Sequence, residues 1–182
     1  MIVLLLLACL PDDVGETGIL LVDSGAKADA DSDTDADSDA DGDADGDADG
    51  DADAALAGTW TSSGADLSDL FAPYFLSLDA TFASNGSYTA HAIDTDHATT
   101  TFKGTWSTDD STSPGAIALT QSTPSNAVSH GIYRVDGDTL TYEVVITEPD
   151  YGYVPPTPSA GFGSTSGPQI EPGVNVQTYR RQ

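Results

Sequence analysis

Short runs in which apolar and polar residues alternate, broken by Gly, Pro, Asn and Asp, make up the chain from residue 55 onward. Alternation with a period of two is typical of strands with one buried face, and turn residues at intervals of roughly ten positions indicate an all-β domain. The pattern predicts about eight strands. We expect them near residues 56–63, 76–83, 87–93, 99–107, 115–121, 128–135, 139–147 and 174–180.

Two predicted hairpins determine which side chains share a face. Asn85-Gly86 and Asp136-Gly137-Asp138 supply the positive φ angles that tight hairpin turns require. A two-residue turn in the first hairpin would align Leu76, Leu78, Ala80, Phe82, His91 and Ile93. The second hairpin aligns Tyr133, Val135, Leu140, Tyr142 and Val144. Its opposite face is polar and carries Arg134, Thr139, Thr141 and Glu143, as expected for a half-buried antiparallel sheet.

Two longer connections stand between the predicted strands. Residues 66–75 carry apolar side chains at helical spacing and predict one short helix or lid. Residues 148–173 contain six prolines and three aromatic residues, and we expect a lid or a partner-contact surface there because long ordered loops are often functional. Eight antiparallel strands without long helices favour a small antiparallel up-and-down β-barrel over a sandwich.

The first 54 residues differ sharply in composition from the rest of the chain. All fourteen aromatic residues lie at Trp60 or later, and every second residue from Asp29 to Asp53 is Asp. Such a segment cannot bury enough apolar surface to fold. We expect residues 9–54 to be a disordered, acidic, Asp-rich linker that tethers a folded domain at 55–182. No specific calcium loop is expected, because the twelfth loop position counted from Asp37 is Ala48, which has no carboxylate.

The N-terminus carries a motif for lipid attachment. Leu6-Leu7-Ala8-Cys9 follows an apolar run and resembles the lipobox of bacterial lipoproteins, although no Lys or Arg precedes the run. The resemblance implies that residues 1–8 are a signal peptide and that Cys9 is lipidated, which anchors the protein to a membrane. Leu10 rather than Asp follows the cysteine, which in that family implies an outer-membrane lipoprotein of the cell envelope, facing the periplasm or the surface.

The folded part resembles an uncharacterised family of bacterial lipocalin-like domains. The motifs, in order, are Leu56-Ala57-Gly58-Thr59-Trp60, Lys103-Gly104-Thr105-Trp106, the Pro114–Leu119 segment, the Gly131–Leu140 segment and the closing Thr178–Arg181 strand. The resemblance implies a lipocalin-like barrel over about 56–182 and no established activity. Pro155-Pro156-Thr157 stands where the family tends to have Arg-Pro-Thr, so Arg180 or Arg181 would have to close the barrel instead.

Charge and cysteine content exclude several classes of protein. A formal net charge of −25, with five basic and thirty acidic residues, argues against nucleic-acid binding. The single cysteine excludes an internal disulfide. His91, Asp94, Asp96 and His97 lie close in sequence, but alternation separates the first two and we expect a surface loop rather than a metal site. No G-x-S-x-G motif occurs, so we expect no catalytic residues, no cofactor and no enzyme.

We expect the barrel to bind a small, apolar ligand or another component of the cell envelope. The alternative is a structural or protein-interaction module whose barrel is filled by side chains. Trp60 and Trp106 either line the ligand site or plug the barrel as core residues, and the weight of aromatic residues in small cores favours the second role. The candidate ligand-binding residues are Trp60, Phe82, His91, Trp106, Tyr133 and Tyr142.

Overall fold

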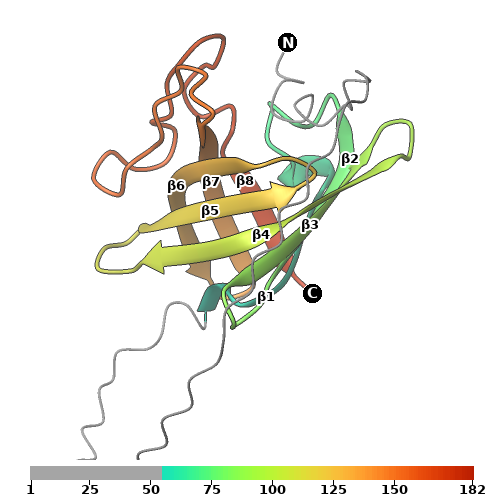
Figure 1. Ribbon diagram of the computed structural model, residues 1–182, viewed down its shortest axis with the longest axis horizontal. Coiled ribbons are helices and arrows are strands. Elements are labelled where there is room, and N and C mark those ends of the chain that lie inside the picture. Colours follow the sequence, from blue (N-terminus) through green and yellow to red (C-terminus); the bar gives the residue numbers. More distant parts are fainter. Residues whose placement is uncertain (1–54) are drawn as a thin grey trace, which may run out of the picture. The chain divides into compact units, whose positions relative to one another are not determined.

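The computed structural model describes residues 55–182, which form an all-β domain of eight antiparallel strands (Figure 1). Each strand pairs with the next, and β8 pairs with β1 to close the barrel. The predicted up-and-down barrel is confirmed, and every strand end lies within three residues of its expected position. The strands are β1 (Gly58–Ser63), β2 (Phe75–Phe82), β3 (Ser87–Asp94), β4 (Thr99–Asp109), β5 (Gly115–Thr123), β6 (Ala127–Asp136), β7 (Thr139–Glu148) and β8 (Gln177–Arg181).

The predictions for the N-terminal third of the chain concern residues that the structure does not describe. The signal peptide at 1–8, the lipidation site Cys9 and the acidic linker at 9–54 lie outside the described residues. Over residues 55–182, no helix combines the length and the apolar character that crossing a membrane requires.

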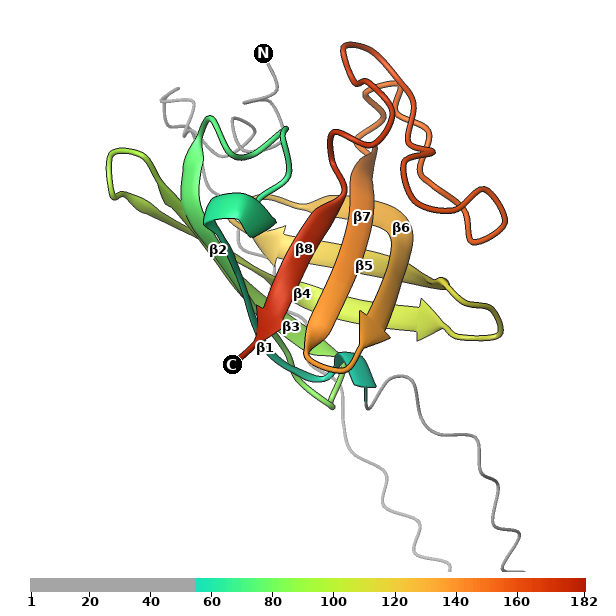
Figure 2. The ribbon, with the colours of Figure 1, turned by 180° about the vertical axis from the view of Figure 1, so that it is seen from behind.

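The strand order places the connections alternately at two ends of the barrel. We call one end the closed end; it holds residues 55–57, the C-terminus and the turns at 83–86, 110–114 and 137–138. We call the other the open end; it holds the connections at 64–74, 95–98, 124–126 and 149–176. Figure 2 shows the 64–74 and 149–176 connections at the same end, away from the C-terminus. These two long connections lie at the open end of the barrel, where the interior meets the surface.

The turn between β2 and β3 contains three residues rather than the expected two. The Ala83 amide donates to the Ser87 carbonyl at 2.9 Å, which encloses Ser84-Asn85-Gly86, and Gly86 has φ 78°. Phe82 therefore pairs with Tyr88. A shift of one residue moves every side chain of a strand to the other face. The expected alignment of His91 and Ile93 with the β2 core residues is wrong; the core-facing residues of β3 are Tyr88, Ala90 and Ala92.

The turn between β6 and β7 has the expected geometry, with Gly137 at φ 57° and Asp136 paired with Thr139. The expected apolar face is confirmed, because its five residues belong to the core or pack against it. The opposite face differs from expectation at one position. Glu143 is fully buried, because the 149–176 connection packs over it.

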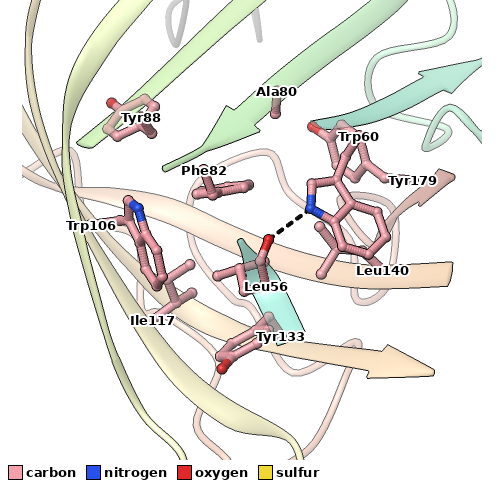
Figure 3. Packing of buried hydrophobic residues seen from close by; sticks show 10 residues of the cluster. All are labelled: Leu56, Trp60, Ala80, Phe82, Tyr88, Trp106, Ile117, Tyr133, Leu140 and Tyr179. Carbon is pink, nitrogen blue, oxygen red and sulfur yellow. Dashed lines mark hydrogen bonds between the residues drawn. The ribbon is translucent and has the colours of Figure 1, made fainter. Parts of the chain in front are cut away.

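The closed end is filled by large side chains (Figure 3). The indole Nε1 of Trp60 donates to the Leu56 carbonyl at 2.8 Å. The Arg181 guanidinium stacks 4.1 Å from the Trp60 ring and donates to the carbonyls of Ala55 and Ala57 at 2.6 and 3.0 Å. Of the two arginines considered from the sequence, Arg181 therefore closes the barrel, whereas Arg180 pairs with Asp66 outside it.

Candidate functional site

A cavity of about 160 Å³ occupies the part of the barrel interior toward the open end. The 64–74 connection borders it with Phe71, whose ring meets that of Phe75, the first residue of β2, edge to face at 6.0 Å. This segment folds as the 3-10 turn η1 (Gly64–Asp66) and a series of turns rather than the expected single helix. We call the 64–74 connection the lid, because its residue Phe71 borders the cavity.

The cavity wall is dominated by apolar and aromatic surface. Its aliphatic part includes Leu78, Ala90, Ala92, Leu119, Val144 and Ile146. Six aromatic rings complete it, from Phe71, Phe75, Tyr88, Phe102, Tyr142 and Tyr179. The wall contains neither Lys nor Arg. Such a lining suits a small ligand with a large apolar surface.

A second, smaller cavity of about 60 Å³ reaches deeper into the barrel. It shares wall residues with the larger one, among them Tyr88, Tyr142 and Tyr179, and it ends against Phe82 and Leu140. Both of these belong to the closed-end core. The barrel is therefore packed at one end and hollow toward the other.

Three tyrosines bring polar groups into this apolar space. The rings of Tyr142 and Tyr179 meet edge to face at 6.0 Å. Burial raises the pKa of Tyr88 to about 12 and the pKa of Tyr142 and Tyr179 well above the ordinary value. Negative charge on the neighbouring tyrosines adds to the shift at Tyr142, and the charge of Asp79 adds to the shift at Tyr179. All three phenols are therefore neutral near pH 7.

The hydroxyls of Tyr88, Tyr142 and Tyr179 take part in none of the protein hydrogen bonds found within residues 55–182. Buried tyrosine hydroxyls usually have a partner. Hydroxyl groups that border a cavity are available to a molecule inside it, both as donors and as acceptors. These three groups are polar contacts that the site offers, beside the wall residues Gln121 and Ser129.

Asp79 and His91 are wall residues whose side chains are held by neighbours on the outer strand faces. The Thr61 hydroxyl donates to Asp79 Oδ1 at 2.6 Å, and His91 Nδ1 lies 3.0 Å from Thr101 Oγ1. Asp79 pairs with His91 across the β2–β3 ladder, and the His91 side chain is exposed. The Asp79 charge nevertheless acts on the interior, as its effect on the Tyr179 pKa indicates.

The six residues expected to bind ligand separate into three groups. Tyr142 borders both cavities, and Phe82 borders the smaller one. His91 contributes to the wall of the larger one. Trp60, Trp106 and Tyr133 belong to the closed-end core and border neither cavity.

The contacts of these core residues explain their positions. Trp106 Nε1 donates to the carbonyls of Ala83 and Ser87, both at 3.1 Å, and so ties β4 to the β2–β3 turn. The Tyr133 hydroxyl donates to Asp110. Wall residues that the sequence reasoning missed are Phe71, Tyr88, Phe102 and Tyr179. The helical spacing of apolar residues in the lid pointed to Phe71. The correct β2–β3 register would have identified Tyr88.

The open end carries negative charge without a compensating base in its connections. The segments 64–74, 95–98, 124–126 and 149–176 contain no Lys or Arg. Their acidic residues are Asp66, Asp69, Asp96, Asp150 and Glu171. Arg180 on β8 pairs with Asp66 at 3.0 Å, so the other four carry the net charge of these connections.

The 149–176 connection is fastened to the barrel by Glu143. Glu143 Oε2 accepts the Gly163 amide at 2.6 Å, and Oε1 accepts the amide and the hydroxyl of Thr165 at 3.0 and 2.6 Å. Asn175 Nδ2 donates to Thr165 Oγ1 at 3.1 Å, which adds the end of the connection to the same network. We call this network the Glu143 clasp. It holds a long, proline-rich segment against the outer face of β7.

Within residues 55–182, no group of three or more His, Cys, Asp or Glu side chains is arranged to hold a metal ion. Asp94 Oδ1 instead accepts the amides of Asp96 and Ala98, both at 2.9 Å. These contacts give Asp94 a role in shaping the β3–β4 turn.

Comparison of the chain with protein-family models, with curated proteins and with solved structures found no match in any of the three. The resemblance to lipocalin-like domains therefore stays a prediction from sequence motifs. The site has to be interpreted from its own geometry.

Proposed function

We propose that this protein binds a small molecule in the open half of its barrel. The observation that carries the proposal is the cavity of about 160 Å³, lined by apolar and aromatic side chains that include three tyrosines. An apolar protein cavity of about 150 Å³ accommodates a benzene molecule. The ligand would therefore have an apolar body about the size of one ring, with one polar group directed at the tyrosines.

The alternative, a filled barrel that acts as a structural or interaction module, is supported by the closed-end core alone. That core fills only one end of the barrel, and the small side chains of Ala90 and Ala92 border the cavity beyond it. Interior space beside phenolic hydroxyls favours the ligand-binding proposal.

We propose binding without chemical conversion. Ser129, His91 and Asp79 all border the cavity, but the His91 ring contacts Thr101 and the Asp79 carboxylate accepts a hydrogen bond from Thr61. A general base needs to reach the group that it activates. These contacts direct both side chains to the outer face of the barrel.

We also propose that the protein is a lipid-anchored component of the cell envelope. Support comes from the lipobox-like Leu6-Leu7-Ala8-Cys9 and from the acidic segment that follows. An anchor at Cys9 and an Asp-rich tether would hold the barrel at a distance from the outer membrane, where it would meet small solutes or other envelope components.

The binding proposal is tested by methyl NMR spectroscopy of the full chain during titration with benzyl alcohol, a neutral molecule of one ring. We expect shifts at the methyl groups of Ala90, Ala92 and Val144, which border the cavity. Absence of shifts at these methyls up to the solubility limit would overturn the proposal.

A cavity-filling variant supplies the matched control. Ala92→Phe places a ring in the larger cavity, whereas Ala118→Phe adds the same ring on β5 opposite the exposed His130. We expect Ala92→Phe to abolish the shifts at Ala90 and Val144 and Ala118→Phe to retain them. Equal binding by the two variants would place the alcohol outside the barrel.

A further inference from the structure

The aromatic composition of the cavity distinguishes it from a general apolar pocket. Six rings, from five strands and the lid, border a space of about 160 Å³. The faces of aromatic rings carry negative partial charge, so several rings around one cavity attract a cation more than a neutral molecule of the same shape.

Fixed charges around the cavity act in the same direction. The wall contains no Lys or Arg, and Asp79 is part of it. The open-end connections contain five acidic residues and no Lys or Arg. An acidic entrance above low-dielectric walls raises the local concentration of cations and repels anions. A carboxylate ligand would find no Lys or Arg partner in this wall.

We propose that the ligand is a small organic cation, an ammonium ion whose apolar body is about one ring in size. The inference deepens the proposed small-molecule function and rests on it. The charged group would lie against the rings of Tyr88, Tyr142 and Tyr179, whose hydroxyl oxygens accept hydrogen bonds from any N–H that the ammonium carries. The Phe102 ring completes the aromatic surround of the charged group, and the apolar body would occupy the space beside Leu119 and Val144.

The test compares two molecules of the same shape and different charge. Choline and 3,3-dimethyl-1-butanol differ by the replacement of the quaternary nitrogen with carbon. Titration calorimetry of the full chain with each, at low salt, should give at least tenfold tighter binding for choline. In 0.5 M NaCl the choline affinity should fall several-fold while that of the alcohol stays constant, because salt screens the charged entrance. The anion 3,3-dimethylbutanoate should not bind.

A pair of ring substitutions tests the role of the aromatic wall. Phe102 borders the cavity, whereas Phe162 lies in the 149–176 connection, 5.7 Å from the Arg134 guanidinium. Phe102→Leu should weaken choline binding about fivefold and alcohol binding less than twofold. Phe162→Leu should change neither. Circular dichroism and thermal unfolding establish that both variants are folded before they are compared.

Each outcome bears on one proposal. Equal affinity for choline and the alcohol, with both lost in Ala92→Phe, would overturn the cation proposal and leave the small-molecule function in place. Choline binding that persists in Ala92→Phe would place the cation outside the cavity and would likewise overturn it. Failure of both molecules and of benzyl alcohol to bind would overturn the small-molecule function itself.

Discussion

The Glu143 clasp gives the sharpest prediction for stability, because three donors converge on one buried carboxylate. The substitution Glu143→Gln keeps the shape of the side chain and replaces one acceptor oxygen with an NH₂ donor. The remaining oxygen can serve Thr165, but the Gly163 amide then faces another donor. Leaving one buried donor unsatisfied costs about 1–3 kcal/mol. The bonds to Thr165 also weaken, because hydrogen bonds to an ionised acceptor are roughly twice as strong as neutral ones.

This cost should appear as local opening before it appears as global unfolding. The barrel strands pair with one another independently of the 149–176 connection, whose only described ladder contact is the isolated Val154–Ser166 bridge. Regions with few buried contacts open at lower free energy than the core. A loss of about 1–3 kcal/mol corresponds to about 5- to 150-fold faster exchange of the clasp amides.

Hydrogen–deuterium exchange measured by mass spectrometry tests this prediction. Peptides that contain Gly163, Thr165 and Ser166 should exchange faster in Glu143→Gln, while peptides from β4 and β5 keep their protection. Glu148→Gln is the matched control, because Glu148 is exposed at the end of the same strand. Unchanged exchange of the clasp peptides in Glu143→Gln, or an equal change in the control, would refute the reasoning.

Two further predictions concern the barrel core. Arg181→Lys removes the guanidinium that stacks on Trp60, and a lysine cannot form both hydrogen bonds to the Ala55 and Ala57 carbonyls. Urea unfolding should therefore show that the free energy of unfolding falls by about 1–3 kcal/mol. An unchanged unfolding midpoint would show that Arg181 does not stabilise the closed end. Raising the pH should also destabilise the protein: the pKa of Tyr88 is about 12 in the folded state and 10.0 otherwise, so the unfolded state loses its proton first and stability falls between these values. Tyr88→Phe should flatten this alkaline decline in a urea-unfolding series, and an equally steep decline in the variant would contradict the assignment to Tyr88.

The sequence predicted the fold because strand alternation and turn residues are local signals. The β6–β7 hairpin was predicted correctly because Gly137 adopts the positive φ that a two-residue turn needs. The β2–β3 hairpin was not, because Asn85-Gly86 suits a two-residue turn as well as the three-residue turn that forms. The additional turn residue shifts the register of β3 by one position, so that Tyr88 faces the barrel interior and the His91 side chain does not.

The burial of Glu143 was not predictable from local pattern. Its strand alternates as a half-buried strand should, and the residue looks solvated beside Arg134 and Thr141. What buries it is a connection that leaves β7 and folds back over the outer face of that strand through Gly163 and Thr165. Proline content indicated that this connection is unusual, but no periodicity reveals its course.

On two strands that border the cavity, side-chain size decreases toward the open end. The inward positions of β3 run from Tyr88 at the closed end through Ala90 to Ala92 at the open end, and β6 runs from Tyr133 through Gly131 to Ser129.

Glycine in the middle of β6 is required, because a Cβ at Gly131 would lie 2.0 Å from the Glu143 carbonyl oxygen. The same holds on β4, where a Cβ at Gly104 would lie 2.0 Å from the Thr120 carbonyl oxygen. Close strand approach thus leaves both interior positions without a side chain. A choice of ligand residues by size favours Trp60, Trp106 and Tyr133, which fill the closed end. The cavity lies instead beside small inward residues nearer the open end, and the aromatic rings of the lid and the neighbouring strands border it. Its position can therefore be predicted from the register of the sheet, and the largest side chains do not indicate it.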